Sequence, residues 1–117
     1  MTKECTKCKL AKNHSEFYFR HERGNYFSIC KRCQRLQQIS RTYNVDLESA
    51  EKLLNIDKCS ICETYVEGQN QHVDHCHKTG KVRGILCNNC NRGIGYFNED
   101  IERIKQSIKY LNKHNVE

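Results

Sequence analysis

Residues 72–93, which read HVDHCHKTGKVRGILCNNCNRG, hold a high density of side chains that can bind metals or move protons. The run contains three histidines, one aspartate, three cysteines and three asparagines. Carboxylate and amide oxygens are hard ligands that suit Mg²⁺ or Mn²⁺, ions that keep several waters and bind phosphate oxygens. A histidine with a pKa of about 6.5 can take a proton from water at neutral pH. Together these side chains suit the hydrolysis of a phosphodiester bond.

Particular residues of the run fit particular roles in such a reaction. Asp74 and Asn91 supply hard oxygens for a catalytic ion, and His75 activates the attacking water. Two other interpretations fit the same side chains. His72, His75 and His77 lie close enough to form a further zinc site, or they are ordinary polar residues on an exposed turn. The residues alone leave all three interpretations open.

The nine cysteines predict a second kind of chemistry. Eight of them form four repeats of the spacing Cys-x2-Cys, and two thiolates at this spacing can hold one ion on a tight turn. Pairing the repeats in chain order gives two four-thiolate zinc sites: Cys5, Cys8, Cys30 and Cys33, then Cys59, Cys62, Cys87 and Cys90. A crossed pairing is the alternative. Cys76 stands alone, and we expect its side chain to turn away from the site.

The composition predicts a small protein of the cytosol. Only 37% of the 117 residues are hydrophobic, and the mean hydropathy is -0.87. No apolar run approaches the roughly 18 residues of a membrane span, and the N-terminal sequence is charged where a signal peptide would be apolar. A reducing cytosol keeps thiols free for metals. We therefore expect a cytoplasmic protein with a small core and without disulfides.

Positive charge is concentrated in the first half of the chain. Residues 1–45 hold ten Lys/Arg and three Asp/Glu, a formal +7, whereas residues 46–117 hold ten and eleven, a formal -1. This field predicts that the first half binds a polyanion; a merely solvated basic surface is the alternative. The expected phosphate contacts come from four side chains: Lys31, Arg32, Arg35 and Arg41.

We expect a ribbon followed by a helix in the first half of the chain, and these elements would carry the positive charge. Aromatic residues at 17–19 and apolar residues at 26–29 flank Gly24 and Asn25 as two short strands flank a turn. This pattern predicts a zinc ribbon whose aromatic residues form a small core, with stacking on nucleic-acid bases as the alternative use. Residues 31–44 carry apolar side chains at helical spacing and predict a helix.

Two further helices are expected from their caps and apolar faces. Asp46 is a predicted N-cap for a helix over 47–55, which we expect to pack against the second half as a lid or spacer. Asn98 is a predicted N-cap for a helix over 99–114, whose isoleucines recur at helical spacing. Core packing accounts for that stripe without any partner.

The dense run itself predicts a strand, a turn at 78–80, a second strand through 82–86 and a short helix through Asn91. The last cysteine pair falls where the second strand meets this helix. A zinc ion there would join the two and hold Asn91 still against His75.

The run HVDHCHKTGKVRGILCNNCNRGIGYFNED, preceded by CSIC, resembles the recombination endonuclease VII family of His-Me finger (HNH-like) nucleases, found largely in phages and prophages. The resemblance covers about residues 44–112. It implies a ββα-metal fold, a structural zinc on the four cysteines of this half, a catalytic divalent ion on Asp74 and Asn91, and His75 as general base. It also implies that His72 and His77 support the phosphate or the substrate.

Two other features bear on the resemblance. The first ribbon, CTKCKLAKNHSEFYF to CKRCQRL, is similar to zinc ribbons seen ahead of such nucleases. Relatives that resolve branched DNA dimerise through long C-terminal helical arms, whereas one helix of about fifteen residues follows the finger here, and Cys76 stands where relatives often carry an acid. We therefore expect a monomer or a weak homodimer.

The expected protein is a small α+β protein of two zinc-stapled modules. Residues 1–45 form a ribbon and basic helix that hold DNA, and residues 46–117 form a His-Me finger endonuclease with two structural Zn²⁺ and one catalytic Mg²⁺ or Mn²⁺ in the whole chain. A monomer nicks DNA and two copies cut both strands, in the cytosol of a phage or prophage host. The alternative is a non-catalytic zinc adaptor that binds DNA or protein.

Overall fold

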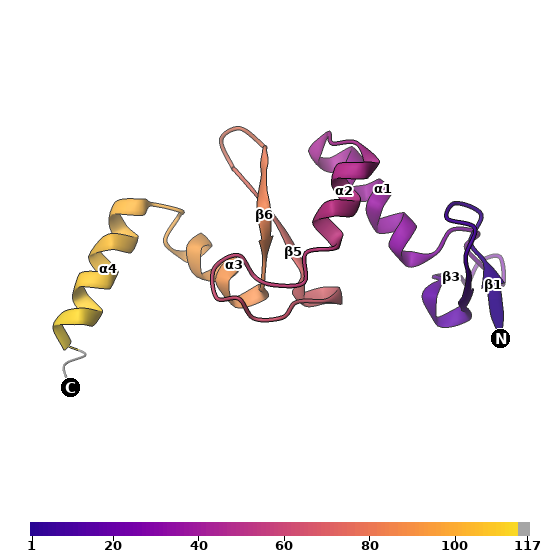
Figure 1. Ribbon diagram of the computed structural model, residues 1–117, viewed down its shortest axis with the longest axis horizontal. Coiled ribbons are helices and arrows are strands. Elements are labelled where there is room, and N and C mark those ends of the chain that lie inside the picture. The colour runs from indigo at the N-terminus through magenta and orange to yellow at the C-terminus, as the bar shows by residue number, and fades with distance from the viewer. Residues whose placement is uncertain (115–117) are drawn as a thin grey trace. The chain divides into compact units, whose positions relative to one another are not determined.

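The computed structural model describes residues 1–114, which form two compact units (Figure 1). The first unit is Met1–Asn55 and the second begins at Ile56. Every sheet in the described residues is a two-stranded antiparallel hairpin. Within residues 1–114, no helix combines the length and the apolar character that crossing a membrane requires.

Two hairpins open the first unit. β1 (Thr2–Glu4) pairs with β2 (Ala11–Asn13), and after a 3-10 turn at His14–Glu16, β3 (Phe19–Arg20) pairs with β4 (Asn25–Tyr26). The second hairpin is the predicted one, although its strands are shorter than the aromatic runs that indicated it. The sequence does not predict the first hairpin, because its strands are only three residues long and carry no alternating apolar pattern.

Sulfur makes up most of the ribbon's small core. The buried side chains there are Cys5, Phe17, Cys30 and Cys33. Three of the predicted core aromatics are instead at least a third exposed: Tyr18, Phe19 and Phe27. Cations cover two of these rings, since Lys31 Nζ lies 5.0 Å from the ring centre of Tyr18 and Arg20 lies over Phe27. The expectation of an aromatic core therefore holds for Phe17 but not for the neighbouring rings.

Two helices complete the first unit. α1 (Lys31–Tyr43) begins directly after Cys30 and ends at Asn44, which adopts a left-handed conformation with φ 54°. α2 (Leu47–Leu54) is capped by Asp46, whose Oδ1 accepts a hydrogen bond of 2.8 Å from the backbone N–H of Ser49. Both helices and the Asp46 cap follow the sequence prediction.

The short link between these helices brings α2 onto α1 (Figure 1). Ile39 of α1 and Ala50 and Leu54 of α2 are buried. A link of three residues favours this contact between neighbouring helices, and the role of α2 as a lid or spacer against the second half stays a prediction. The first compact unit consequently ends at Asn55, ten residues beyond the expected module boundary.

The second unit contains the predicted order of strand, strand and helix. β5 (His72–His75) pairs with β6 (Val82–Leu86), and α3 (Asn88–Tyr96) packs on β5. A 3-10 turn at Gly68–Asn70 precedes β5. The α+β class and the ββα unit are thus confirmed in the described residues.

The core of the second unit lies under β6. Ile85 is fully buried, and Val66, Leu86 and the sulfur-bearing Cys59 and Cys87 are buried around this part of the chain. The one buried polar side chain among residues 1–114 is Gln71, whose Nε2 donates a 2.9 Å hydrogen bond to the Ile56 carbonyl. This bond satisfies an amide that would otherwise be expensive to bury.

The last helix, α4 (Ile101–His114), departs from two expectations. Its N-cap is Asp100, whose Oδ1 accepts from the Arg103 N–H at 3.1 Å, and not Asn98. None of the residues in 101–114 is buried, and Ile101, Ile108 and Leu111 are more than half exposed. The isoleucine stripe is therefore not explained by core packing within the described residues.

Ile85 gives a test of where stability in the second unit resides. Replacing this fully buried side chain by alanine leaves a cavity, so we expect Ile85→Ala to lower the free energy of unfolding by about 2–5 kcal/mol in urea titration. Ile61→Ala removes the same atoms from a side chain that is 55% exposed and should lower it by well under half as much. If the two substitutions lower the free energy of unfolding equally, the core of the second unit does not lie around Ile85.

Candidate functional site

The eight paired cysteines form two clusters. Cys5, Cys8, Cys30 and Cys33 make the first, Cys59, Cys62, Cys87 and Cys90 the second, and within each the sulfur atoms all lie within 4.8 Å of one another. The pairing in chain order is confirmed and the crossed pairing is wrong. Cys76 belongs to neither cluster, as predicted. Each set of four close sulfurs fits a tetrahedral ion, and the two clusters are consistent with two structural zinc sites.

Backbone amides prepare the first cluster for an ion. Burial alone would raise the pKa of the Cys5 thiol, but the N–H groups of Cys8, Cys30 and Lys7 donate to its sulfur at 3.3–3.4 Å and lower that pKa to about 6. Burial and the neighbouring sulfurs raise the pKa of Cys33 instead. Four thiolates at this separation repel one another, so the cluster needs a cation to be fully charged.

The second cluster follows the same plan. Burial opposes ionisation of Cys59, but amides of Cys62, Cys87 and Ile61 lower the pKa of its thiol to about 6, while burial and the other sulfurs raise the pKa of Cys90 to about 12. Cys87 closes β6 and caps α3, because its sulfur accepts from the N–H of Cys90 at 3.4 Å. An ion here joins the end of the strand to the start of the helix.

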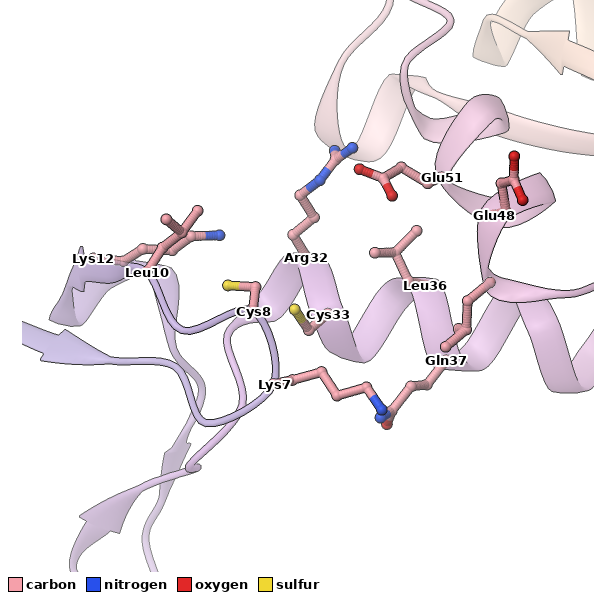
Figure 2. Close-up of a pocket in the computed structure, with 11 residues that line it drawn as sticks. Lys7, Cys8, Leu10, Lys12, Arg32, Cys33, Leu36, Gln37, Glu48 and Glu51 are labelled. Carbon is pink, nitrogen blue, oxygen red and sulfur yellow. The ribbon is translucent and has the colours of Figure 1, made fainter.

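A lysine supports the first cluster from outside. Lys12 Nζ lies 3.2 Å from the sulfur of Cys30, and the cluster's negative charge raises the pKa of the ammonium although its burial opposes this. Figure 2 shows the hollow beside this contact, about 430 Å³ in volume, whose lining includes Cys8, Cys33 and Lys7. Four thiolates around Zn²⁺ carry a formal -2, so one ammonium offsets half of that charge.

On the ββα unit, the structure places Asp74 beside an arginine. Both oxygens of the Asp74 carboxylate accept from Arg83, at 2.7 Å from Nε and 2.9 Å from Nη2. Arg83 Nη2 also contacts Oε1 of Glu99. Hydrogen bonds to these two carboxylates raise the pKa of Arg83 above its ordinary range, so the guanidinium stays charged.

The histidines at the end of β5 join the same group of side chains. His77 Nε2 lies 2.9 Å from Oε2 of Glu99, and the rings of His75 and His77 are 4.9 Å apart at a tilt of 33°. The structure thus brings together Asp74, His75 and His77, with Arg83 and Glu99 as further members. These five side chains form what we call the hairpin cluster.

The other two predicted site residues lie on the same unit. His72 begins β5, and its buried Nε2 has no hydrogen-bond partner among residues 1–114. Asn91 lies in the first turn of α3, directly after Cys90, and its backbone N–H donates to the Cys87 carbonyl at 3.0 Å. The helix that carries Asn91 packs on the strand that carries Asp74 and His75.

The four predicted DNA-binding residues lie on α1 but differ in their surroundings. Arg41 is exposed, whereas the ammonium of Lys31 covers the Tyr18 ring. Arg32 Nη2 donates to Asn55 Oδ1 at 2.8 Å, and Arg35 is half-buried, which lowers its pKa. Arg32 and Arg35 are close enough for the charge of Arg32 to add to the lowering of the Arg35 pKa by burial.

The model of the family described as recombination endonuclease VII matches residues 31–113, well over half of the chain. The chain belongs to this family. The resemblance of the dense run is thereby confirmed, and the match also includes α1 and α2, which that run does not reach.

Known relatives of this endonuclease VII family chain occur in phages. It is 37% identical to the Gene 59 protein of Mycobacterium phage D29 over 81 residues, which are 65% of this chain and 48% of that protein. It is 44% identical to the Gene 59 protein of Mycobacterium phage L5 over 57 residues, 46% of this chain and 34% of that one. The chain thus spans half or less of the length of these curated relatives.

A solved structure is also similar. The crystal structure of the ββα-Me type II restriction endonuclease Hpy99I is 27% identical, with a TM-score of 0.47, over 97% of this chain and 66% of that one. A TM-score at this level does not by itself establish a common fold, so the ββα assignment stands on the strands and helix described above.

Sequence reasoning missed Arg83, Glu99 and Lys12. A hairpin that turns at 78–80 places residue 74 opposite Gly84, so strand alternation puts the neighbouring Arg83 on the other face, and only the register shift between Asp74 and His75 brings it to the carboxylate. Glu99 lies beyond α3, and the Lys12–Cys30 contact joins two separate segments. Nothing local in the sequence signals either of them.

Lys12 gives a test of how the first cluster holds its ion. Removing the ammonium leaves a more negative cluster, so Lys12→Ala should weaken Zn²⁺ binding at this cluster by about 10–100-fold, the usual worth of an outer partner. Competition with a chromophoric chelator measures it. Lys7→Ala removes the same charge from the same hollow but keeps the backbone N–H through which Lys7 contacts Cys5, and it should change the affinity little. If the two substitutions weaken Zn²⁺ binding equally, the effect of Lys12 comes from its charge near the cluster and not from its contact with Cys30.

Proposed function

We propose that the chain is a divalent-metal-dependent endonuclease that hydrolyses phosphodiester bonds of DNA. The observation that carries this proposal is the family match over residues 31–113, which runs through Asp74, His75 and Asn91. The ββα unit supports it, because a hairpin and a packed helix hold these side chains on rigid elements. Both thiolate clusters take structural Zn²⁺ in this proposal, and neither takes part in the reaction because a four-thiolate site has no open position.

Asp74 and Asn91 hold the catalytic Mg²⁺ or Mn²⁺. Their fit to the ion rests on the donor set, a carboxylate on β5 and an amide on α3, the helix that packs on that strand. The bound ion supplies charge that polarises the phosphate and stabilises the leaving oxygen. All other steps belong to side chains of this chain.

His75 acts as the general base. It takes a proton from water as the water oxygen bonds to phosphorus, and the bond from phosphorus to the leaving sugar oxygen breaks. His77 and His72 support the phosphate. His72 begins β5, the strand that also carries Asp74 and His75, which supports this role for it.

The first unit holds DNA in this proposal. Residues 1–55 carry eleven Lys/Arg and six Asp/Glu, a formal +5, against +1 for the rest of the chain. The contacts come from Lys31, Arg32, Arg35 and Arg41 on α1. The protein acts as a monomer or weak homodimer, with one site per chain cutting one strand, so a double-strand cut needs two copies. The phage relatives support action in the cytosol of a host cell.

A second candidate is a zinc adaptor that binds DNA or protein without cutting. The observation that favours it is the occupation of both Asp74 oxygens by Arg83, which leaves the carboxylate already neutralised. Incubation of supercoiled plasmid with Mg²⁺ or Mn²⁺, with EDTA as control, separates the two candidates. Metal-dependent nicking supports the endonuclease, and intact plasmid at all metal concentrations supports the adaptor.

The same plasmid assay tests the roles of the side chains. His75→Ala should retain two zinc ions, the fold and DNA binding but cleave more slowly by a factor of about 10²–10⁴, the usual worth of a general base. Asp74→Ala should instead recover part of its rate as Mn²⁺ is raised, since excess ion compensates for a missing ligand but not for a missing base. A His75→Ala chain that cleaves at the normal rate would transfer the base role to His77 or His72.

The DNA-holding role of α1 predicts a dependence on salt. Phosphate contacts release counterions, so changing Lys31, Arg32 and Arg35 to alanine should flatten the plot of log affinity against log salt by up to about one unit for each phosphate that is no longer neutralised. Fluorescence anisotropy with a labelled duplex measures this slope. As a matched control, replacing three exposed lysines of α4, Lys105, Lys109 and Lys113, should leave the slope unchanged. If the slope of log affinity against log salt is unchanged in the α1 variant, these cations are a solvated helix face that does not contact DNA.

A further inference from the structure

Arg83 and a divalent ion would compete for the same atoms. The guanidinium holds Asp74 Oδ2 through Nε at 2.7 Å and Oδ1 through Nη2 at 2.9 Å. Paired contacts of this kind are among the stronger hydrogen bonds in proteins. The Asp74 side chain is only 12% exposed, so few waters are available to replace the guanidinium. An ion on Asp74 must therefore displace Arg83 or be repelled by it at short range.

A β-bulge is what brings Arg83 to Asp74. Asp74 pairs with Gly84 and His75 pairs with Val82, so Arg83 is the extra residue in β6 and the register shifts at this point. In a regular ladder Arg83 would point to the face opposite that of Gly84 and Asp74. A bulge re-aims the side chain of the extra residue. Gly84, directly across from Asp74, adds no side chain of its own beside the carboxylate.

Glu99 offers Arg83 a second carboxylate. Its Oε1 contacts Arg83 Nη2, and its Oε2 lies 2.9 Å from His77 Nε2. The Glu99 side chain is 22% exposed, comparable to that of Asp74. Arg83 thus lies between two carboxylates, of which Asp74 alone is a proposed ion ligand. A small movement of the guanidinium would exchange one partner for the other.

The backbone at Glu99 is held in an uncommon conformation. Asn98 and Glu99 have φ values of 55° and 56°, and neither is glycine. The end of α3 accounts for Asn98, since one left-handed residue commonly closes a helix. A second left-handed residue is not required by that cap and is unfavourable for glutamate. The contacts of its side chain with Arg83 and His77 offset this and fix where the carboxylate lies.

We propose that Arg83 and Glu99 set the affinity of Asp74 for its divalent ion. Arg83 covers Asp74 in the ion-free chain and transfers to Glu99 when an ion binds, so the ion displaces a protein cation whose charge Glu99 then neutralises. Both are positioning residues, because they act on the ion site through Asp74. The inference rests on the proposed function in one respect, which is that it takes Asp74 as an ion ligand.

Direct titration with Mn²⁺ tests the pair without any cleavage. The full chain with both zinc ions bound, and no DNA, is titrated while electron paramagnetic resonance measures free Mn²⁺. Arg83→Gln removes the competing charge a few ångströms from the ion and should tighten Mn²⁺ binding by about ten-fold or more. Lys81→Gln is the matched control, since it removes one positive charge from an exposed side chain two residues away on the same hairpin. It should change the affinity by less than about two-fold.

Two more variants test the role of Glu99. Arg83→Lys keeps the charge but cannot make the two-pronged contact, so its affinity should fall between those of wild type and Arg83→Gln. Glu99→Gln leaves Arg83 with Asp74 as its charged partner and should weaken Mn²⁺ binding. Part of that weakening is simple charge removal, so the double variant is decisive: in the Arg83→Gln background, Glu99→Gln should have a clearly smaller effect.

The outcomes separate this inference from the function on which it rests. Asp74→Ala should abolish the Mn²⁺ site, and a chain that binds Mn²⁺ equally with and without Asp74 overturns the proposed ion site and this inference together. Binding through Asp74 that is unchanged or weaker in Arg83→Gln, with both zinc ions retained, overturns the inference alone. If the effects of Arg83→Gln and Glu99→Gln on Mn²⁺ affinity are additive, Arg83 does not exchange Asp74 for Glu99, and that part of the inference is wrong.

Discussion

Four sulfur atoms within 4.8 Å of one another can all be charged only if a cation lies among them, and both units of this chain are built around such a group. In the ribbon of the first unit, cysteines supply all but one of the buried core side chains. A chain that is 37% hydrophobic has little other material from which to build a core. Structural zinc typically contributes on the order of 10 kcal/mol to the folding of small domains. A zinc ion in each cluster would therefore couple the folding of that unit to the binding of its ion.

The second thiolate cluster extends this constraint to the hairpin cluster. Cys87 is the single residue between the end of β6 and the start of α3, and Asn91 follows Cys90 directly. An ion held there fixes the helix that carries Asn91 relative to the strand pair that carries Asp74 and His75. Glu99 fixes the other end of α3 by its contacts with Arg83 and His77. The helix is thus tied to the hairpin by sulfur at its start and by ion pairs just after its end.

The parts of this structure that the sequence predicted are those governed by local spacing. Cys-x2-Cys repeats, the turn at Gly80 and the Asp46 cap each depend on a few neighbouring residues. The sequence does not determine what an apolar face meets: α2 packs on α1, and most of the stripe of α4 is exposed. Amphipathic periodicity indicates that a face exists but not its partner. Arg83 was missed for a related reason, because a one-residue bulge reverses the side that strand alternation predicts.

The ion pair at Asp74 changes how the proposed site would be loaded. Mg²⁺ usually binds through one or two carboxylates together with substrate phosphates and several waters, so a single carboxylate already neutralised by Arg83 is a poor ion site by itself. A DNA phosphate beside Asp74 would add negative charge and oxygen ligands, and it would also offer the displaced guanidinium another anion. The ion and the DNA substrate would then each increase the affinity of the chain for the other, because both favour release of Asp74 by Arg83. In the proposed enzyme the Arg83–Asp74 pair would consequently make completion of the ion site depend on bound DNA.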